Sequence, residues 1–99
     1  MNYQASEKLQ KLQSKYTIEG GEWTEEIAEQ ELVLYYLTPE DSVLEIGGNI
    51  GRVSLIISTI VPGESHIVLE SNKKYAETLQ KNRDRNQASF KVEASALSS

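Results

Sequence analysis

A glycine-rich run at 45–51 holds the residues best suited to chemistry. It reads Glu-Ile-Gly-Gly-Asn-Ile-Gly and follows a short apolar segment. Glycine lets the backbone turn sharply and approach a ligand closely. Asn49 stands where dinucleotide-binding loops usually carry a second glycine, and asparagine is one of the few other residues that tolerate a positive φ. The run is therefore a candidate ligand-binding loop between a strand and a helix.

Two acidic residues indicate the kind of ligand. Glu45 precedes the first glycine, where it would repel a pyrophosphate but would accept hydrogen bonds from an ammonium group or from loop amides. Glu70 lies 19 residues after Gly51, a position from which an acid can bind both hydroxyls of a ribose. Together the two acids fit S-adenosylmethionine better than NAD. The structural alternatives are a solvated acid at a strand end for Glu70 and a cap of loop amides for Glu45.

The elements that position these residues follow from the apolar pattern. We expect a strand at 43–46, a helix at 52–61, a strand at 66–69, a helix capped by Ser71 or Asn72, and a strand at 90–94. The nearly continuous apolar runs of the first two strands are typical of strands buried on both faces. The order β-α-β-α-β with short connections predicts parallel strands joined by right-handed crossovers. The predicted fold is α/β, a Rossmann-like three-layer α-β-α arrangement with a partial parallel sheet, preceded by N-terminal helices.

Two segments precede this unit. Residues 1–21 carry one narrow stripe at helical spacing, formed by Leu9, Leu12 and Tyr16. We expect an N-terminal arm or accessory helix there, separate from a domain at 22–99. Thr24 is expected to cap a following helix, which Pro39 terminates because the residue before proline disfavours helical geometry.

Three other side chains are expected to be structural. Tyr35 and Tyr36 have the spacing of aromatic residues in a core, with the lining of a pocket as the alternative. His66 is expected at the surface, at the start of a strand. No serine is placed to form a nucleophile–base pair with this histidine.

The composition excludes several classes of protein. The chain has 99 residues, a formal net charge of −5, no cysteine and one histidine. Disulfide frameworks, thiolate zinc sites and clusters of several histidines are therefore excluded, and the acidic balance argues against nucleic-acid partners. The longest apolar stretch, 53–62, is far short of the roughly 18 residues that span a bilayer, and no secretory signal opens the chain. We expect no membrane association and a cytoplasmic location.

The motifs resemble those of a known family. The loop at 45–51 is followed by Glu70, by Lys-Asn-Arg-Asp-Arg-Asn at 81–86 and by Glu-Ala-Ser-Ala-Leu-Ser at 93–98. This combination resembles the class I S-adenosylmethionine-dependent methyltransferases, and within them the FkbM-like group. That group reads D-x-G-A-N-x-G, then an acid, then a helix with L-x-x-N-x-x-x-N, then an A-L-S run. The resemblance covers about 57 residues, 43–99.

The resemblance implies a cofactor site. Its residues would be Glu45, Gly47, Gly48, Asn49, Ile50, Gly51, Glu70, Ser71, Ala94 and Ser95. Glu45 and Gly47 would border the methionine moiety, residues 48–51 would pass under the ligand, and Glu70 would bind the ribose. The segment 93–96 would flank the adenine. Glu45 departs from the commoner aspartate, so its contacts to the amino group could differ.

The resemblance also implies an incomplete sheet. The family sheet has seven strands, and those after the third have no counterpart in the 99 residues. The expected function is a truncated S-adenosylmethionine-binding domain that would transfer a methyl group to an unknown acceptor once completed by a missing half or a partner. A homo-oligomer or a partner that completes the sheet is therefore expected. The alternative is a non-catalytic Rossmann-like oligomerisation or interaction module that has lost activity, so whether the chain is an enzyme stays open.

Overall fold

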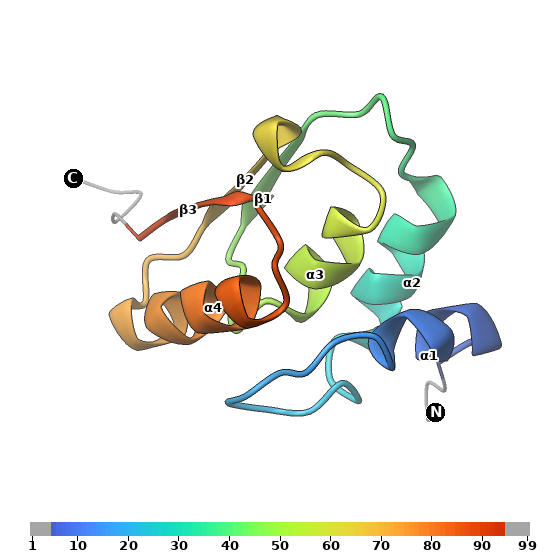
Figure 1. Ribbon diagram of the computed structural model, residues 1–99, viewed down its shortest axis with the longest axis horizontal. Coiled ribbons are helices and arrows are strands. Elements are labelled where there is room, and N and C mark those ends of the chain that lie inside the picture. Colours follow the sequence, from blue (N-terminus) through green and yellow to red (C-terminus); the bar gives the residue numbers. More distant parts are fainter. Residues whose placement is uncertain (1–4, 95–99) are drawn as a thin grey trace.

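The computed structural model describes residues 5–94. Its elements are α1 (Glu7–Gln13), α2 (Ile27–Tyr36), β1 (Val43–Ile46), α3 (Arg52–Ser58), the 3₁₀ turn η1 (Gly63–Ser65), β2 (His66–Leu69), α4 (Lys73–Arg85) and β3 (Lys91–Glu93). The strands form one parallel sheet in the order β1-β2-β3 (Figure 1). The predicted β-α-β-α-β order and the parallel pairing are confirmed. Within residues 5–94 no helix is long and apolar enough to cross a membrane.

The main core lies between one face of the sheet and the helices α3 and α4. Val68 of β2 packs there with Leu55 of α3, Leu79 of α4 and Phe90, and all four are buried. Successive residues of a strand point to opposite faces. The buried face of the sheet is therefore the one that carries Val68, and the glycine loop leads from the carboxyl end of β1 into α3.

The opposite face of β1 corrects the prediction of a strand buried on both faces. Leu44 and Ile46 are 62% and 65% exposed, whereas Val43 and Glu45 on the other face are half-buried. Within the described residues β1 pairs only with β2 and lies at the edge of the sheet. An apolar run does not indicate whether its strand is central or at the edge of the sheet. The sequence pattern alone therefore predicted burial on both faces.

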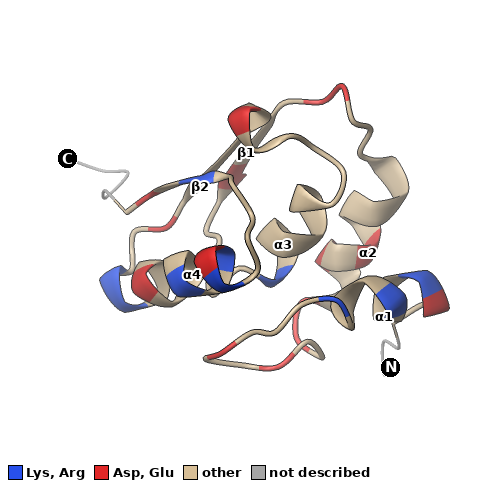
Figure 2. Cartoon of the chain, in the orientation of Figure 1, with Lys and Arg blue, Asp and Glu red and all other residues tan. Residues whose placement is uncertain are grey.

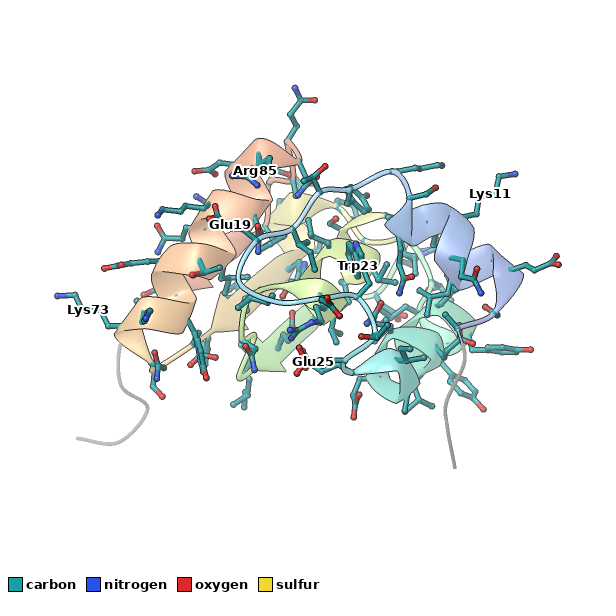
Figure 3. All side chains as sticks on the ribbon, turned by 90° about the horizontal axis from the view of Figure 1, so that it is seen from below. Lys11, Glu19, Trp23, Glu25, Lys73 and Arg85 are labelled. Carbon is teal, nitrogen blue, oxygen red and sulfur yellow. The ribbon has the colours of Figure 1, made fainter. Side chains whose placement is uncertain are left out.

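The segment before β1 packs against the rest of the molecule. Leu9 of α1 is fully buried in a cluster with Ile27 of α2 and Ile56 of α3. Ser6 caps α1 by accepting a hydrogen bond from the Leu9 amide at 3.1 Å. The chain between α1 and α2 then runs along α4 and reaches the start of α3, with Glu19 beside Arg85 (Figure 3).

Helix α2 begins later than expected. Its N-cap is Glu26, with a φ of 61°, and not Thr24. The buried guanidinium of Arg52 provides the reason, because it binds Glu25 at 2.6 Å and Glu26 at 2.8 Å. Figure 2 shows the acidic residues along this segment beside the basic start of α3. These tertiary contacts override the local capping preference of threonine.

Two further predictions about side chains were wrong. Tyr35 and Tyr36 were expected in the core, but both are exposed on the outer side of α2. Helix α2 is apolar around most of its circumference, and only one side can face α3. His66 was expected at the surface but is fully buried, because it points to the same face of the sheet as Val68.

Candidate functional site

The glycine loop follows the carboxyl end of β1 and has three residues with positive φ. These are Gly47 at 76°, Asn49 at 55° and Gly51 at 103°. The amides of Gly47 and Gly48 both donate to the carbonyl oxygen of Leu69, at 2.7 and 3.2 Å. The loop is thereby fixed against the end of β2.

The glycines of the loop serve different purposes. A Cβ at Gly48 would collide with Val68, and one at Gly51 would lie 2.8 Å from Cδ1 of Leu79. Both glycines are therefore needed for close packing of the loop on β2 and α4. A Cβ at Gly47 would meet no atom within 4 Å. Only a positive φ requires glycine there, so the space beside Gly47 is open to a ligand.

Glu70 joins the glycine loop to α4. It is 7% exposed, and its Oε1 accepts a hydrogen bond from the Asn49 amide at 2.8 Å. Its Oε2 accepts one from the Asn72 amide, also at 2.8 Å. Asn72 in turn caps α4 by accepting a hydrogen bond from the Tyr75 amide. The sequence had left Ser71 and Asn72 as alternative caps of this helix. Glu70 is therefore not the solvated acid of the structural alternative.

Glu45 lies beneath α3. Its Oε1 accepts a hydrogen bond from Oγ of Ser54 at 2.7 Å and lies 3.2 Å from Nε2 of His66. Nε2 is thus the ring nitrogen of His66 that faces the carboxyl group, and Nδ1 is buried without a partner among the described residues. The His66 ring packs 4.9 Å from that of Phe90. An ammonium ligand of Glu45 would have to compete with Ser54 and His66.

The remaining predicted site residues differ in their exposure. Ile50 is buried, and its carbonyl oxygen accepts a hydrogen bond from Nδ2 of Asn82 at 2.8 Å. Ser71 follows β2 and Ala94 follows β3, and both are exposed at the carboxyl edge of the sheet. Ser95 lies outside the described residues. The structure thus brings the loop, Glu70 and Ser71 together at one edge of the sheet.

Asn82 and Asn86 bind the segment that joins α1 to α2. Asn82 accepts a hydrogen bond from the Glu19 amide at 2.9 Å and donates to the Glu19 carbonyl at 3.0 Å. Asn86 makes the same pair of bonds to Thr17, at 2.9 and 2.8 Å. Side-chain amides one helical turn apart therefore bind alternate residues of an extended backbone. The sequence showed the four-residue spacing of Asn82 and Asn86, but it did not reveal that they bind the backbone between α1 and α2.

Arg52 is a second residue whose role the sequence did not reveal. It occupies the position of the last glycine in a G-x-G-x-x-G loop. Besides Glu25 and Glu26, it donates to the Glu22 carbonyl at 2.6 Å. The acidic pair Glu25 and Glu26, directly before α2, was the available signal. Its distance from Arg52 in the sequence gave no indication of the contact.

Three cavities lie away from the glycine loop. One of about 440 Å³ and one of about 320 Å³ are lined by residues of α1, α2 and their neighbours. One of about 310 Å³ on the outer side of α2 is lined partly by Tyr35 and Tyr36. None of these three includes a residue of the loop or Glu70.

Comparison with known proteins identifies the fold. No protein-family model and no curated protein matches the sequence. A putative O-methyltransferase from Klebsiella pneumoniae is similar in structure, with a TM-score of 0.61 and 16% identity over 94% of this chain and 45% of that one. The YcgJ protein from Bacillus subtilis has a TM-score of 0.58 and 19% identity over 67% of this chain and 29% of that one.

The chain has a methyltransferase-like Rossmann fold. The predicted α/β class with a parallel Rossmann-like sheet is thereby confirmed. Among residues 5–94 the helices cover only one face of the sheet, so the second helical layer of the predicted α-β-α arrangement is not among them. Identities below 20% establish the fold alone. The chain spans less than half the length of either solved structure.

Proposed function

We propose that this chain is the S-adenosylmethionine-binding half of a methyltransferase of the FkbM-like group. The observation that carries the proposal is Gly47, which follows β1, has a positive φ and has open space where a side chain would lie. Ligands of open α/β sheets bind outside the carboxyl ends of the strands. The residues at this edge fit such a ligand, because the carboxylate of Glu70 and the hydroxyl of Ser71 directly follow the neighbouring strand β2.

Each site residue would bind or orient the cofactor. Glu70 would accept ribose hydroxyls through lone pairs that its two amide bonds leave free. Residues 48–51 would pass beneath the ligand, and Ala94 and Ser95 would flank the adenine. The cofactor, when bound, would supply a methyl group carried on a sulfonium. We assign the task of holding the methyl acceptor in line to polypeptide beyond the half of the fold that this chain matches.

Calorimetric titration with S-adenosylhomocysteine tests this proposal. We expect micromolar binding to the unmodified chain and none to Gly47→Val, whose side chain would fill the open space. Gln87→Val is the matched control, because Gln87 also has a positive φ of 59° but follows the far end of α4. Absence of heat from the unmodified chain at millimolar ligand, or equal binding by both variants, contradicts the proposal.

A second candidate function is a non-catalytic interaction module. It is favoured by Glu45, whose carboxylate bonds to Ser54 and His66 inside the molecule, and by the exposed apolar residues of β1. This candidate predicts no heat with S-adenosylhomocysteine from a correctly folded chain. The same titration therefore separates the two functions.

A further inference from the structure

The segment between α1 and α2, residues 14–26, packs against the glycine loop. We call this segment the strap, and Figure 3 shows it in light blue between the two helices. A Cβ at Gly21 would lie 3.0 Å from Cδ1 of Ile50, and one at Gly20 would lie 3.4 Å from Cγ2 of the same residue. The backbone of the strap therefore lies directly against the buried side chain of Ile50.

Asn82 of α4 binds the strap and the glycine loop with one side chain. Its Oδ1 accepts a hydrogen bond from the Glu19 amide at 2.9 Å. Its Nδ2 donates to the carbonyl oxygens of Glu19 at 3.0 Å and of Ile50 at 2.8 Å. The side chain is fully buried, and a buried backbone group that loses its partner is costly. Removal of Asn82 would therefore release both the strap and the Ile50 carbonyl.

Arg52 joins the strap to the residue that directly follows the glycine loop. Its guanidinium donates to the Glu22 carbonyl at 2.6 Å and pairs with the carboxylates of Glu25 and Glu26. The Arg52 side chain is 5% exposed, so these bonds are shielded from water on the side of the arginine. The strap is thus bonded to the end of the loop at two separate points, through Asn82 and through Arg52.

We propose that Asn82 is a positioning residue for the cofactor, which couples the strap to the glycine loop. This inference rests on the proposed function. The first half of the loop is held at the end of β2, by the carbonyl of Leu69 and the carboxylate of Glu70. The second half is held from α4 by the bond between Asn82 and Ile50. Because Asn82 is fully buried, it acts through the loop and not by contact with the cofactor.

The coupling affects the affinity for the cofactor. A loop that is already held in its binding geometry binds a ligand without the cost of ordering the loop. When the loop is held for only a fraction of the time, the apparent affinity falls by that fraction. The strap therefore contributes to affinity from the side of the loop that packs on α4, and the bound cofactor stabilises the strap in return.

Amide hydrogen exchange without ligand tests the hold on the loop. The Gly51 amide donates to the Gly48 carbonyl at 3.0 Å, and the amide of Val68 in the middle strand is the reference for global opening. We expect Asn82→Ala to accelerate exchange at Gly51 about tenfold more than at Val68. A purely structural role of Asn82 would accelerate both amides by the same factor, and that result overturns the inference.

Calorimetric titration with S-adenosylhomocysteine tests the effect on affinity. We expect Asn82→Ala to bind about tenfold more weakly than the unmodified chain, at a temperature at which circular dichroism shows both folded. Asn86→Ala is the matched control, because Asn86 makes the same pair of bonds to Thr17 of the strap but none to the glycine loop. Its affinity should stay within about twofold of the unmodified chain.

The outcomes separate this inference from the proposed function. No binding by the unmodified chain contradicts the proposed function, and the exchange experiment still decides whether Asn82 holds the loop. Equal binding by the unmodified chain and Asn82→Ala overturns this inference alone.

Gly21→Ala is a second variant, for use if Asn82→Ala does not fold. Its methyl group would collide with the Arg52 guanidinium and press on Ile50, so it displaces the strap without removing a bond from Asn82. We expect S-adenosylhomocysteine to bind this variant about threefold more weakly than the unmodified chain. Unchanged affinity of a folded Gly21→Ala overturns the coupling between the strap and the glycine loop.

Discussion

At the scale of single residues, the acids of the site are held by internal hydrogen bonds. Glu70 accepts hydrogen bonds from the backbone amides of Asn49 and Asn72. Glu45 accepts a hydrogen bond from the Ser54 hydroxyl and contacts the His66 ring. The sequence predicted both acids as site residues from their distance to the glycines. Their internal partners could not be predicted, because Ser54 and His66 come near Glu45 only through the packing of α3 and β2.

Glu70→Gln tests the hydrogen bonds by which Glu70 links the glycine loop to the start of α4. The amide group of glutamine can accept only one of the two backbone amides and turns a donor toward the other. We expect a loss of about 1–3 kcal/mol in the free energy of unfolding, measured by urea denaturation. Glu77→Gln, at an exposed position of α4, is the control and should change stability little. Equal stability of the two variants would show that the hydrogen bonds of Glu70 do not stabilise the contact between the glycine loop and α4.

At the scale of elements, β1, β2 and the start of α4 were predictable and the N-terminal packing was not. The helix expected at 52–61 ends at Ser58, and the strand expected at 90–94 spans Lys91–Glu93. The apolar runs gave β1 and β2 with their observed bounds, and Asn72 was one of two predicted caps. The start of α2 was missed because Arg52 holds Glu25 and Glu26 through tertiary contacts. The local residue pattern reveals the periodicity of a helix or strand, but it contains no information about ion pairs between residues far apart in the sequence.

Asn82→Ala should release the segment between α1 and α2. The substitution removes a buried side chain that makes three hydrogen bonds to the backbone of Glu19 and Ile50. We expect a loss of about 2–3 kcal/mol in stability and faster cleavage after Glu19 by a glutamate-specific protease. Asn86→Ala, whose bonds are less buried, should have a smaller effect. Equal cleavage of Asn82→Ala and the unmodified chain would contradict this role.

Arg52→Met tests the contact that delays the start of α2. Methionine keeps much of the buried volume but leaves Glu25 and Glu26 without their cation. The Glu25 and Glu26 side chains are 64% and 29% exposed and stay solvated. We therefore expect a loss of only about 1–2 kcal/mol in the free energy of unfolding. Raising the salt concentration should narrow this difference only slightly, because the guanidinium is buried. A stability equal to that of the unmodified chain would show that the ion pairs contribute nothing.

At the scale of the whole molecule, the structure is one three-stranded parallel sheet with helices on one face among its described residues. The sequence predicted the parallel order, and similarity to a putative O-methyltransferase supports the fold. The exposure of Leu44 and Ile46 could not be predicted, since it depends on which elements pack against that face of the sheet. The exposed Leu44 and Ile46 lie on one face of the sheet, whereas the glycine loop lies at its carboxyl edge.

The most direct test of the central claim is a map of backbone amide NMR shifts during titration with S-adenosylhomocysteine. We predict that the largest shifts occur at Gly47, Gly48 and Ser71, with smaller ones at the start of α4. Shifts confined to the outer side of α2, or none at millimolar ligand, would contradict a cofactor site at the carboxyl edge of the sheet.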